Sequence, residues 1–343
     1  FMPADLTAGI EFNQDKLEDN MWGYHRTVDQ KVNIGSAFFQ NEWKNEHWGF
    51  LIGGRLDKHN LIDHVIFSPR ANLRYNPTEN INLRFSYSSG FRAPQAFDED
   101  LHVENVGGNV AMVELADNLK EERSQSLSAS ADIYHRFGAF QVNFLVEGFY
   151  TKLSDVFALT DGEIVDGILT RTRYNAPGAR VMGLTLEGKM AYLTKFQLQA
   201  GITLQQSHYS EPHVWNKVAP AVKKMMRTPN TYGYFTATYT PIKPLSIALS
   251  GTYTGSMLVP HEPVPGFLEK PITVNTKDFF DIGLKAAYDF KLYKSMNLQV
   301  NAGVQNIFNA YQNDFDKGAD RDSGYIYGPS LPRSFFAGVK ISY

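Results

Sequence analysis

The sequence has no cysteine and no long apolar run in its 343 residues. The absence of cysteine suits an oxidising envelope, in which unpaired thiols are a liability. No stretch approaches the roughly 18 apolar residues of a membrane-spanning helix. Such a chain could cross a bilayer only as a closed β-barrel, because every backbone polar group would have to be paired within the protein.

The sequence also has little net charge, since 33 lysines and arginines stand against 36 aspartates and glutamates, a balance of −3. No clustered basic stripe with stacking aromatics is present, which argues against a nucleic-acid partner. No nucleophile, base and orienting acid occur in a suggestive arrangement, and no glycine-rich phosphate loop links a strand to a helix. We therefore predict a protein that is not an enzyme and that needs no cofactor or metal of its own.

What the sequence does contain is an alternation of apolar and polar residues with a period of two. In 81–91 apolar odd positions alternate with polar even positions, and similar patterns recur in 196–205, 296–305 and 334–343; in the first segment the apolar residues are Ile81, Leu83, Phe85 and Tyr87, and the polar ones are Asn82, Arg84, Ser86 and Ser88. Because successive side chains of a strand point to opposite faces, these segments are strands with one apolar and one polar face. Doubly buried strands would read as continuous apolar runs, and amphipathic helices would show apolar residues at i, i+3 and i+4.

This alternation predicts an all-β fold, a transmembrane antiparallel β-barrel with about 14 strands in this chain. Short links such as 44–47, 76–80 and 136–139 alternate with mostly long connections. That asymmetry is typical of bacterial outer-membrane barrels, which have periplasmic turns and extracellular loops. The strands are expected near 5–13, 32–44, 47–58, 64–76, 81–91, 121–136, 139–152, 178–193, 195–209, 227–240, 244–256, 277–290, 296–308 and 331–343.

Several stretches, taken in their order along the chain, resemble the C-terminal barrel of TonB-dependent outer-membrane receptors. The stretch 118–122 is similar to the family motif Asn-Leu-Lys-Pro-Glu, with Glu121 where proline is usual. The sequences of 91–102 and 325–329 look most like those of receptors from Bacteroidetes-type bacteria. The remaining stretches are 67–70, 76–80, 87–94, 173–176 with 181–187, and 305–309 followed by 331–333.

The resemblance implies a larger architecture, because family members have a 22-stranded barrel that encloses an N-terminal plug. The plug side of these receptors carries the segment that the TonB complex pulls. Residues 1–343 contain no counterpart of the plug or of the first strands, so we expect the C-terminal part of such a barrel. With no signal peptide and a start almost inside a strand, the chain is expected to be a fragment or a processed portion.

The resemblance also implies a place and partners. The expected location is the bacterial outer membrane, where the lipid bilayer and lipopolysaccharide surround the barrel. Further expected partners are an iron chelate or similar ligand, the TonB complex acting through the missing plug region, and a surface lipoprotein.

One candidate ligand residue, His102, lies among carboxylates in the loop 92–120. In the haem-uptake branch of the family an axial histidine lies between the counterparts of 91–94 and 118–119, and imidazole is a good iron ligand. The acidic neighbours of His102 would repel haem propionates, and an exposed loop histidine is usually only solvated. His102 therefore remains a candidate on the strength of its position.

A second set of candidates lies in the loop 207–227, which mixes aromatic surface with positive charge. This combination suits an anionic, aromatic iron chelate such as a catecholate siderophore, through cation–π contacts and charge-assisted hydrogen bonds. The alternative is an extracellular rim near lipopolysaccharide that binds no ligand. The candidates are His208, Tyr209, His213, Trp215, Lys223, Lys224 and Arg227.

The loop 314–322 places carboxylates at a spacing of two, beginning with Asp314 and Asp316. It resembles a calcium loop superficially, but it lacks the full spacing pattern and the distal bidentate glutamate. We therefore expect no calcium site there.

The predicted function is active transport of a scarce ligand across the outer membrane, energised through TonB. The expected ligand is a ferric siderophore or another iron chelate. The alternatives are a haem or cobalamin receptor, a passive channel of about 14 strands, and a structural or adhesive barrel. A closed passive channel predicts that strand 5–13 pairs with strand 331–343.

Overall fold

The computed structural model describes residues 2–22, 26–94, 110–160, 163–165, 168–293, 295–318, 321–322, 324–329 and 331–343. In these ranges the regular structure is β-strand, without an α-helix. None of the described segments forms a helix long and apolar enough to span a membrane. Fourteen strands follow one another in sequence order across one sheet, which confirms the predicted all-β class and strand number.

Each of these strands corresponds to one predicted range and pairs antiparallel with the next strand in the sheet, as between β1 and β2. The fourteen strands are β1 (Ala4–Met21), β2 (Arg26–Lys44), β3 (Trp48–His59), β4 (Ile66–Thr78), β5 (Ile81–Arg92), β7 (Glu122–Phe137), β8 (Phe140–Ser154), β12 (Ala179–Tyr192), β13 (Phe196–His213), β15 (Thr231–Ile242), β16 (Leu245–Thr254), β19 (Phe279–Tyr293), β20 (Met296–Gln305) and β21 (Ser334–Ser342).

The β1–β2 hairpin is longer than predicted. The outward face of β1 carries Leu6, Ile10 and Phe12, which are 65%, 90% and 70% exposed. Beyond Phe12 the same face carries Gln14 and Lys16, so the alternation that predicted the strand ends there. Backbone pairing nevertheless continues to the last residue of β1. The hairpin therefore extends past the apolar band.

The long connections contain strands that the sequence did not predict. A four-stranded sheet comprises β6 (Val110–Leu115), β9 (Val156–Leu159), β10 (Glu163–Val165) and β11 (Ile168–Ala176), with β6 parallel to β11. A separate hairpin pairs β17 (Leu258–His261) with β18 (Ile272–Asn275), and β14 (Val222–Lys224) adds to β13. These elements give the loop end a structure of its own.

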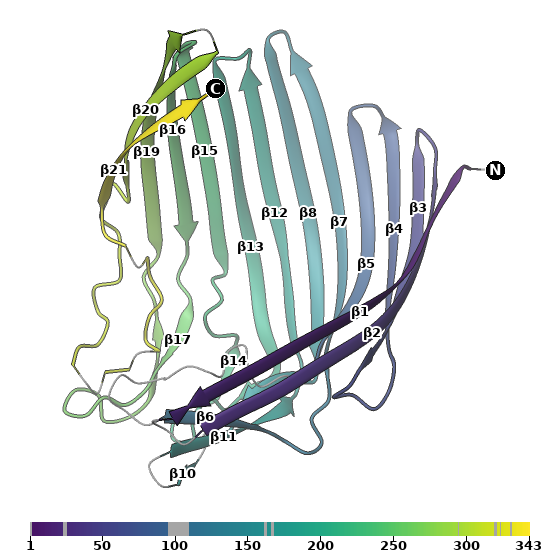
Figure 1. The fold of residues 1–343 in the computed structure, drawn as a ribbon, viewed down its shortest axis with the longest axis vertical. Coiled ribbons are helices and arrows are strands. Elements are labelled where there is room, and N and C mark those ends of the chain that lie inside the picture. The colour runs from purple at the N-terminus through teal and green to yellow at the C-terminus, as the bar shows by residue number, and fades with distance from the viewer. Residues whose placement is uncertain are drawn as a thin grey trace.

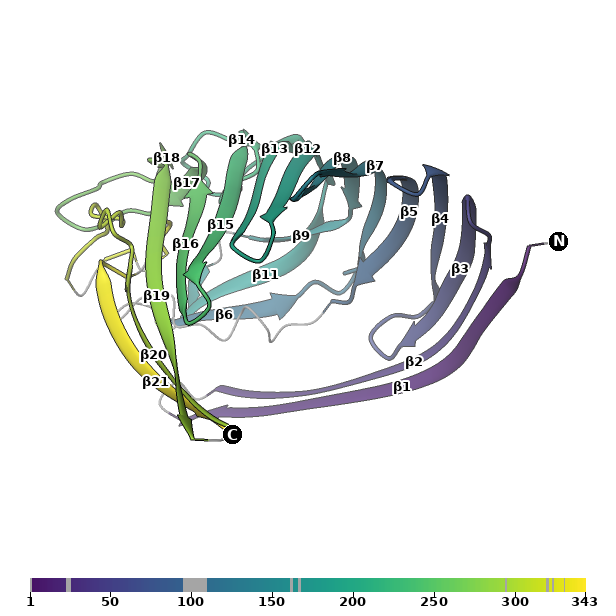
Figure 2. The same cartoon turned by 90° about the horizontal axis from the view of Figure 1, so that it is seen from above.

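The main sheet is strongly curved, and β6, β9 and β11 lie on its concave side (Figure 2). The strands β6 and β11 lie at the end that carries the long loops (Figure 1). In the same view β1 and β2 run obliquely to the other strands, across the open side of the curve. In the order of the sheet, β1 has β2 as its neighbour and β21 has β20. The pairing of first and last strand that a closed passive channel predicts is not among the strand pairs described.

The concave face is identified by its contacts with the inner sheet. Glu122 accepts a hydrogen bond from the backbone N–H of Phe157 at 3.0 Å, and the Arg92 guanidinium lies 5.6 Å from the Phe157 ring centroid. The strand period then places Phe85 and Leu127 on the opposite, convex face, where they are 49% and 41% exposed. Along 81–88 and 126–133 the inward side chains are polar and the outward ones apolar, as a membrane barrel requires.

Aromatic side chains cluster at the end of the short turns. Trp48 and Tyr75 stack at 4.2 Å between ring centroids, and Phe140 and Tyr192 lie 4.6 Å apart. The amphipathic rings of Trp48, Tyr75 and Tyr192 suit the boundary between lipid and water. The aromatic side chains at this end are typical of the girdles that flank the apolar band of a membrane barrel.

We expect Gly178→Ala to destabilise the loop end of the barrel. A Cβ at Gly178 would lie 2.0 Å from the backbone oxygen of Leu153, which cannot move without disturbing the β8–β12 pairing. The expected loss is about 1–3 kcal/mol of unfolding free energy, measured by thermal unfolding of the full-length protein in detergent. Gly148→Ala is the matched control, because nothing lies within 4 Å of a Cβ there. Equal melting temperatures for the two variants would contradict the prediction.

Candidate functional site

Asn175 holds together three segments at the loop end. Its side-chain N–H groups donate to the backbone oxygens of Lys120 and Asp155 at 3.0 and 2.8 Å, and its Oδ1 accepts from the Lys120 N–H at 2.7 Å. The stretches 118–122 and 173–176, each recognised separately in the sequence, thus meet through one amide. Because an amide both donates and accepts, the Asn175 side chain can bond both the backbone oxygen and the backbone N–H of Lys120.

Phe157 connects this junction to the inner sheet. The guanidinium groups of Arg92 and Arg173 lie 5.6 and 5.7 Å from its ring centroid, within the range of cation–π attraction. Arg173 is only 5% exposed. The arginine of the stretch 91–94 therefore has a structural role in docking the inner sheet on the concave wall.

Asn306 forms a second junction. Its side chain donates to the backbone oxygens of Ala310 and Leu331, both at 2.9 Å, and accepts from the Ala310 N–H at 2.8 Å. It is 2% exposed and has a φ of 50°, a left-handed conformation that asparagine tolerates. The stretches 305–309 and 331–333 are therefore joined across the long last loop.

Glu121 closes a third junction beside the β3–β4 loop. Its Oε1 lies 2.6 Å from an Arg123 Nη2 and 3.0 Å from His64 Nε2, and the residue is 3% exposed. Burial acts to raise the pKa of this carboxyl. Hydrogen bonds from its own backbone N–H, from Arg123 and from His64 outweigh burial and hold the pKa below its usual value.

The last long loop packs against the β17–β18 hairpin through a buried polar cluster. His261 stacks on Tyr325 at 3.8 Å between ring centroids, and its Nε2 lies 2.9 Å from Asp316 Oδ2. Both Tyr325 and Tyr327 donate their hydroxyls to Asp314. Burial, together with the neighbouring carboxylate, raises the pKa of both tyrosines, so they remain hydrogen-bond donors.

These contacts bear on the calcium question. Asp314 and Asp316 are engaged by tyrosine, histidine and backbone donors. Within the described ranges, no group of three histidine or acidic side chains is placed to hold a metal ion. The acidic loop is organised by internal hydrogen bonds.

The predicted ligand residues do not lie on one surface. His102 falls outside the described residues. The strand pairs align Gln206 with the outward Leu127, so Tyr209, three residues further on, faces inward. Its ring lies 4.7 Å from that of His213. Burial raises the pKa of Tyr209 and lowers that of His213. This pair lies beyond the outward apolar residues of β13, at the mouth of the interior.

The other predicted residues have different surroundings. Arg227 donates through its guanidinium to the backbone oxygens of Ile326, at 2.9 Å, and of Gly324. Trp215 is half-buried, and its enclosed indole N–H has no hydrogen-bond acceptor among the described residues. Lys223 is exposed. His208 and Lys224 are register partners and share the outward face. Arg227 thus stabilises the loop, and His208 and Lys224 point away from the interior.

The interior wall holds arginines that the sequence did not single out. Arg70 on β4 and Arg84 on β5 face inward, and Arg74 lies directly opposite Arg84. Arg74 donates to the backbone oxygen of Asn45, but none of the three forms an ion pair within the described part of the chain. Like charges in opposed strand positions repel. The neighbouring inward positions are small and polar: Ser86, Ser88, Ser124, Ser126, Ser128 and Ser130.

Comparison with known proteins gives one family match and many similar folds. The family model described as TonB dependent receptor-like, beta-barrel matches residues 3–307. No curated protein sequence matches significantly.

Three solved structures illustrate the similar folds. A variant of the ferric enterobactin receptor PfeA of Pseudomonas aeruginosa has a TM-score of 0.68 at 18% identity, covering 98% of this chain and 51% of its own. The siderophore receptor PirA of Acinetobacter baumannii gives 0.69 at 17%, covering 99% and 52%. The FrpB iron transporter of Neisseria meningitidis gives 0.64 at 16%, covering 98% and 52%. The chain spans about half the length of these proteins.

Proposed function

The chain belongs to the TonB-dependent receptor-like β-barrel family, and from this premise we propose that its parent protein is an active transporter of the bacterial outer membrane. The chain forms part of the barrel wall, and long extracellular loops capture a scarce ligand. Movement of a plug, driven through TonB, lets the ligand pass. The observation that carries the proposal is the family match over 3–307, combined with a polar concave wall and an apolar convex one.

The proposed ligand is an anionic iron chelate of the ferric siderophore class. Arg70 and Arg84 offer positive charge on the interior wall and form no ion pair with the residues that the structure describes. At the mouth, Tyr209 and His213 present adjacent rings, which suits an aromatic chelate. The names of the similar structures, which include receptors of ferric enterobactin, point to the same class. His102, Trp215 and Lys223 remain candidates for ligand contact.

Growth on defined iron sources tests this proposal. After deletion of the gene, we expect loss of growth on ferric siderophores and unchanged growth on haem. Loss confined to haem, cobalamin or carbohydrate use would contradict the chelate assignment. An upstream plug with a short coupling segment is expected in the gene, whereas a signal peptide immediately before Phe1 would contradict TonB-driven transport.

A charge reversal on the interior wall distinguishes the passage of the ligand through the barrel from its capture at the cell surface. We expect Arg70→Glu in the full-length receptor to lower the uptake rate of an anionic ferric chelate by roughly tenfold, because it repels the passing charge. Binding at the cell surface should change little, since Arg70 lies below the loops. Lys195→Glu, in an exposed turn, is the control with the same change in charge. Unchanged uptake by Arg70→Glu, measured with radioactive iron, would contradict a role for this wall.

A further inference from the structure

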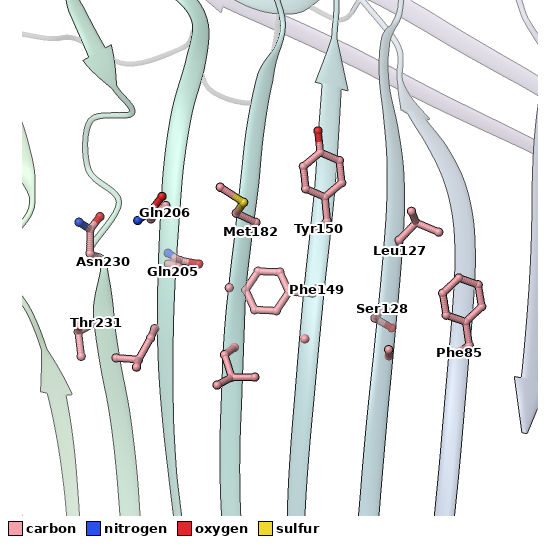
Figure 3. Close-up of a pocket in the computed structure, with 15 residues that line it drawn as sticks. Phe85, Leu127, Ser128, Phe149, Tyr150, Met182, Gln205, Gln206, Asn230 and Thr231 are labelled. Carbon is pink, nitrogen blue, oxygen red and sulfur yellow. The ribbon is translucent and has the colours of Figure 1, made fainter. Parts of the chain in front are cut away.

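The convex face of the barrel contains an apolar groove with a volume of about 900 Å³. Its floor is made by Ala129 and Gly148, which are register partners on β7 and β8. Figure 3 shows Phe85, Leu127, Tyr150 and Met182 around this floor, each from a different strand. Because these side chains are on the outward face, the groove opens toward lipid and not toward the interior.

The groove is apolar below and polar at its upper end. Leu184, Leu204 and Thr231, the register partner of Leu204, continue the floor, while Gln206 lies two residues nearer to the long loops than Leu204. In Figure 3 the Tyr150 hydroxyl and Gln206 lie at the same end of the group of labelled residues. An occupant with an apolar tail and a polar head would match this polarity.

Directly beyond the polar end, a row of basic side chains crosses four strands. Lys152 on β8 is the register partner of Arg180 on β12, Arg180 is the partner of His208 on β13, and His208 is the partner of Lys224 on β14. Neighbouring strands lie about 4.8 Å apart, so the row spans roughly 15 Å. On the first three of these strands, the basic residue lies two residues nearer to the long loops than Tyr150, Met182 and Gln206, respectively.

This row has no counterion in the described part of the chain. The side chains of Lys152, Arg180 and Lys224 form no ion pair or hydrogen bond there. Like charges in directly opposed strand positions are destabilising, so an external anion would relieve them. The row and the groove together form a surface that suits a ligand with an anionic head next to an acyl chain.

We propose that this surface binds lipopolysaccharide, with lipid A phosphates on the basic row and one acyl chain in the groove. A flexible chain fills a groove that would otherwise forfeit dispersion contacts with its walls. The basic row lies on the side of the extracellular loops, which is where the head of an outer-leaflet lipid is found. The inference depends on the membrane orientation in the proposed function but not on the transported ligand.

Binding of lipid A to the full-length protein in detergent tests the proposal. Native mass spectrometry would compare added lipid A, phosphatidylglycerol and phosphatidylcholine. We expect preference for lipid A, and a loss of at least about tenfold in its affinity in the double variant R180E/K224E, at roughly fivefold per cation. The control K223E makes a charge reversal beside Lys224 but on the other face of β14.

The groove is tested separately with a matched glycine pair. Gly148 and Gly188 both face outward, and a Cβ at either meets nothing within 4 Å. Gly148→Leu fills the groove and should weaken lipid A binding, whereas Gly188→Leu should not. Uptake of the ferric chelate by the same variants shows whether transport fails independently of lipid binding.

Each outcome bears on the proposal. Unchanged lipid A affinity in R180E/K224E, or equal losses in K223E, would overturn the role of the basic row. Equal binding of phosphatidylglycerol would overturn the assignment to lipopolysaccharide. Equal effects of Gly148→Leu and Gly188→Leu would overturn the place of the acyl chain. Selective loss in R180E/K224E and Gly148→Leu supports it.

Discussion

Replacing Asn306 by alanine is expected to release the last long loop from the barrel. The change removes three hydrogen bonds and leaves the Ala310 N–H and the oxygens of Ala310 and Leu331 without their partner. A buried group left unsatisfied costs about 1–3 kcal/mol, and these groups, which are only partly buried, lie toward the lower end of that range. Alanine also tolerates the left-handed backbone less well than asparagine. We therefore expect a loss of roughly 3–5 kcal/mol in local stability.

Limited proteolysis and hydrogen exchange of residues 307–318 would measure this effect in the full-length protein. Asn297→Ala is a suitable control, because the Asn297 side chain is exposed and makes one contact of 3.5 Å, to the Ser295 oxygen. Asn306→Asp should retain part of the stability, since its carboxylate still accepts from the Ala310 N–H. Equal protection in Asn306→Ala and Asn297→Ala would show that the junction does not hold the loop.

Replacing Glu121 by glutamine is expected to free the β3–β4 loop and the start of β7. Removing one partner of a buried ion pair commonly costs about 3–5 kcal/mol, although the exposure of Arg123 and His64 reduces this figure. The pair also predicts acid sensitivity. Because the pKa of Glu121 is lowered in the folded protein, its contribution is complete at neutral pH and is lost as pH falls below the ordinary value of 4.5.

Hydrogen exchange of residues 59–66 as a function of pH measures this prediction. The native protein should lose protection there in acid, and Glu121→Gln should show weak protection already at neutral pH. Glu46→Gln, in an exposed turn, keeps the pH profile of the native protein. A native profile that stays flat down to pH 3 would contradict the assigned role of Glu121.

The strands of the main sheet were predictable because their signal is local. In 81–88 apolar and polar residues alternate at every step, and the structure pairs this strand with its predicted neighbours. The inner sheet gave no such signal. β6 pairs in parallel with β11, and the first residue of β11 lies 58 residues after the first residue of β6. Nothing in either segment's sequence indicates that the other is its partner. Non-local pairings of short strands were therefore missed.

The candidate site shows the same limit at the level of single residues. Arg227 was nominated for its charge, but its guanidinium binds backbone oxygens 97 and 99 residues away in the sequence. His208 and Tyr209 were grouped as neighbours, yet the strand period sends them to opposite faces. The members of the basic row lie on four different strands. Finding the row from the sequence would have required the strand register as well as this period.

The length of the β1–β2 hairpin affects what reaches the cell from outside. Residues 14–21 of β1 continue past the last outward apolar residue, Phe12, for about 27 Å along the strand. In the proposed orientation this polar ribbon stands clear of the lipid headgroups. Macromolecules that approach from outside would contact this ribbon without touching the interior wall proposed as the route of the ligand.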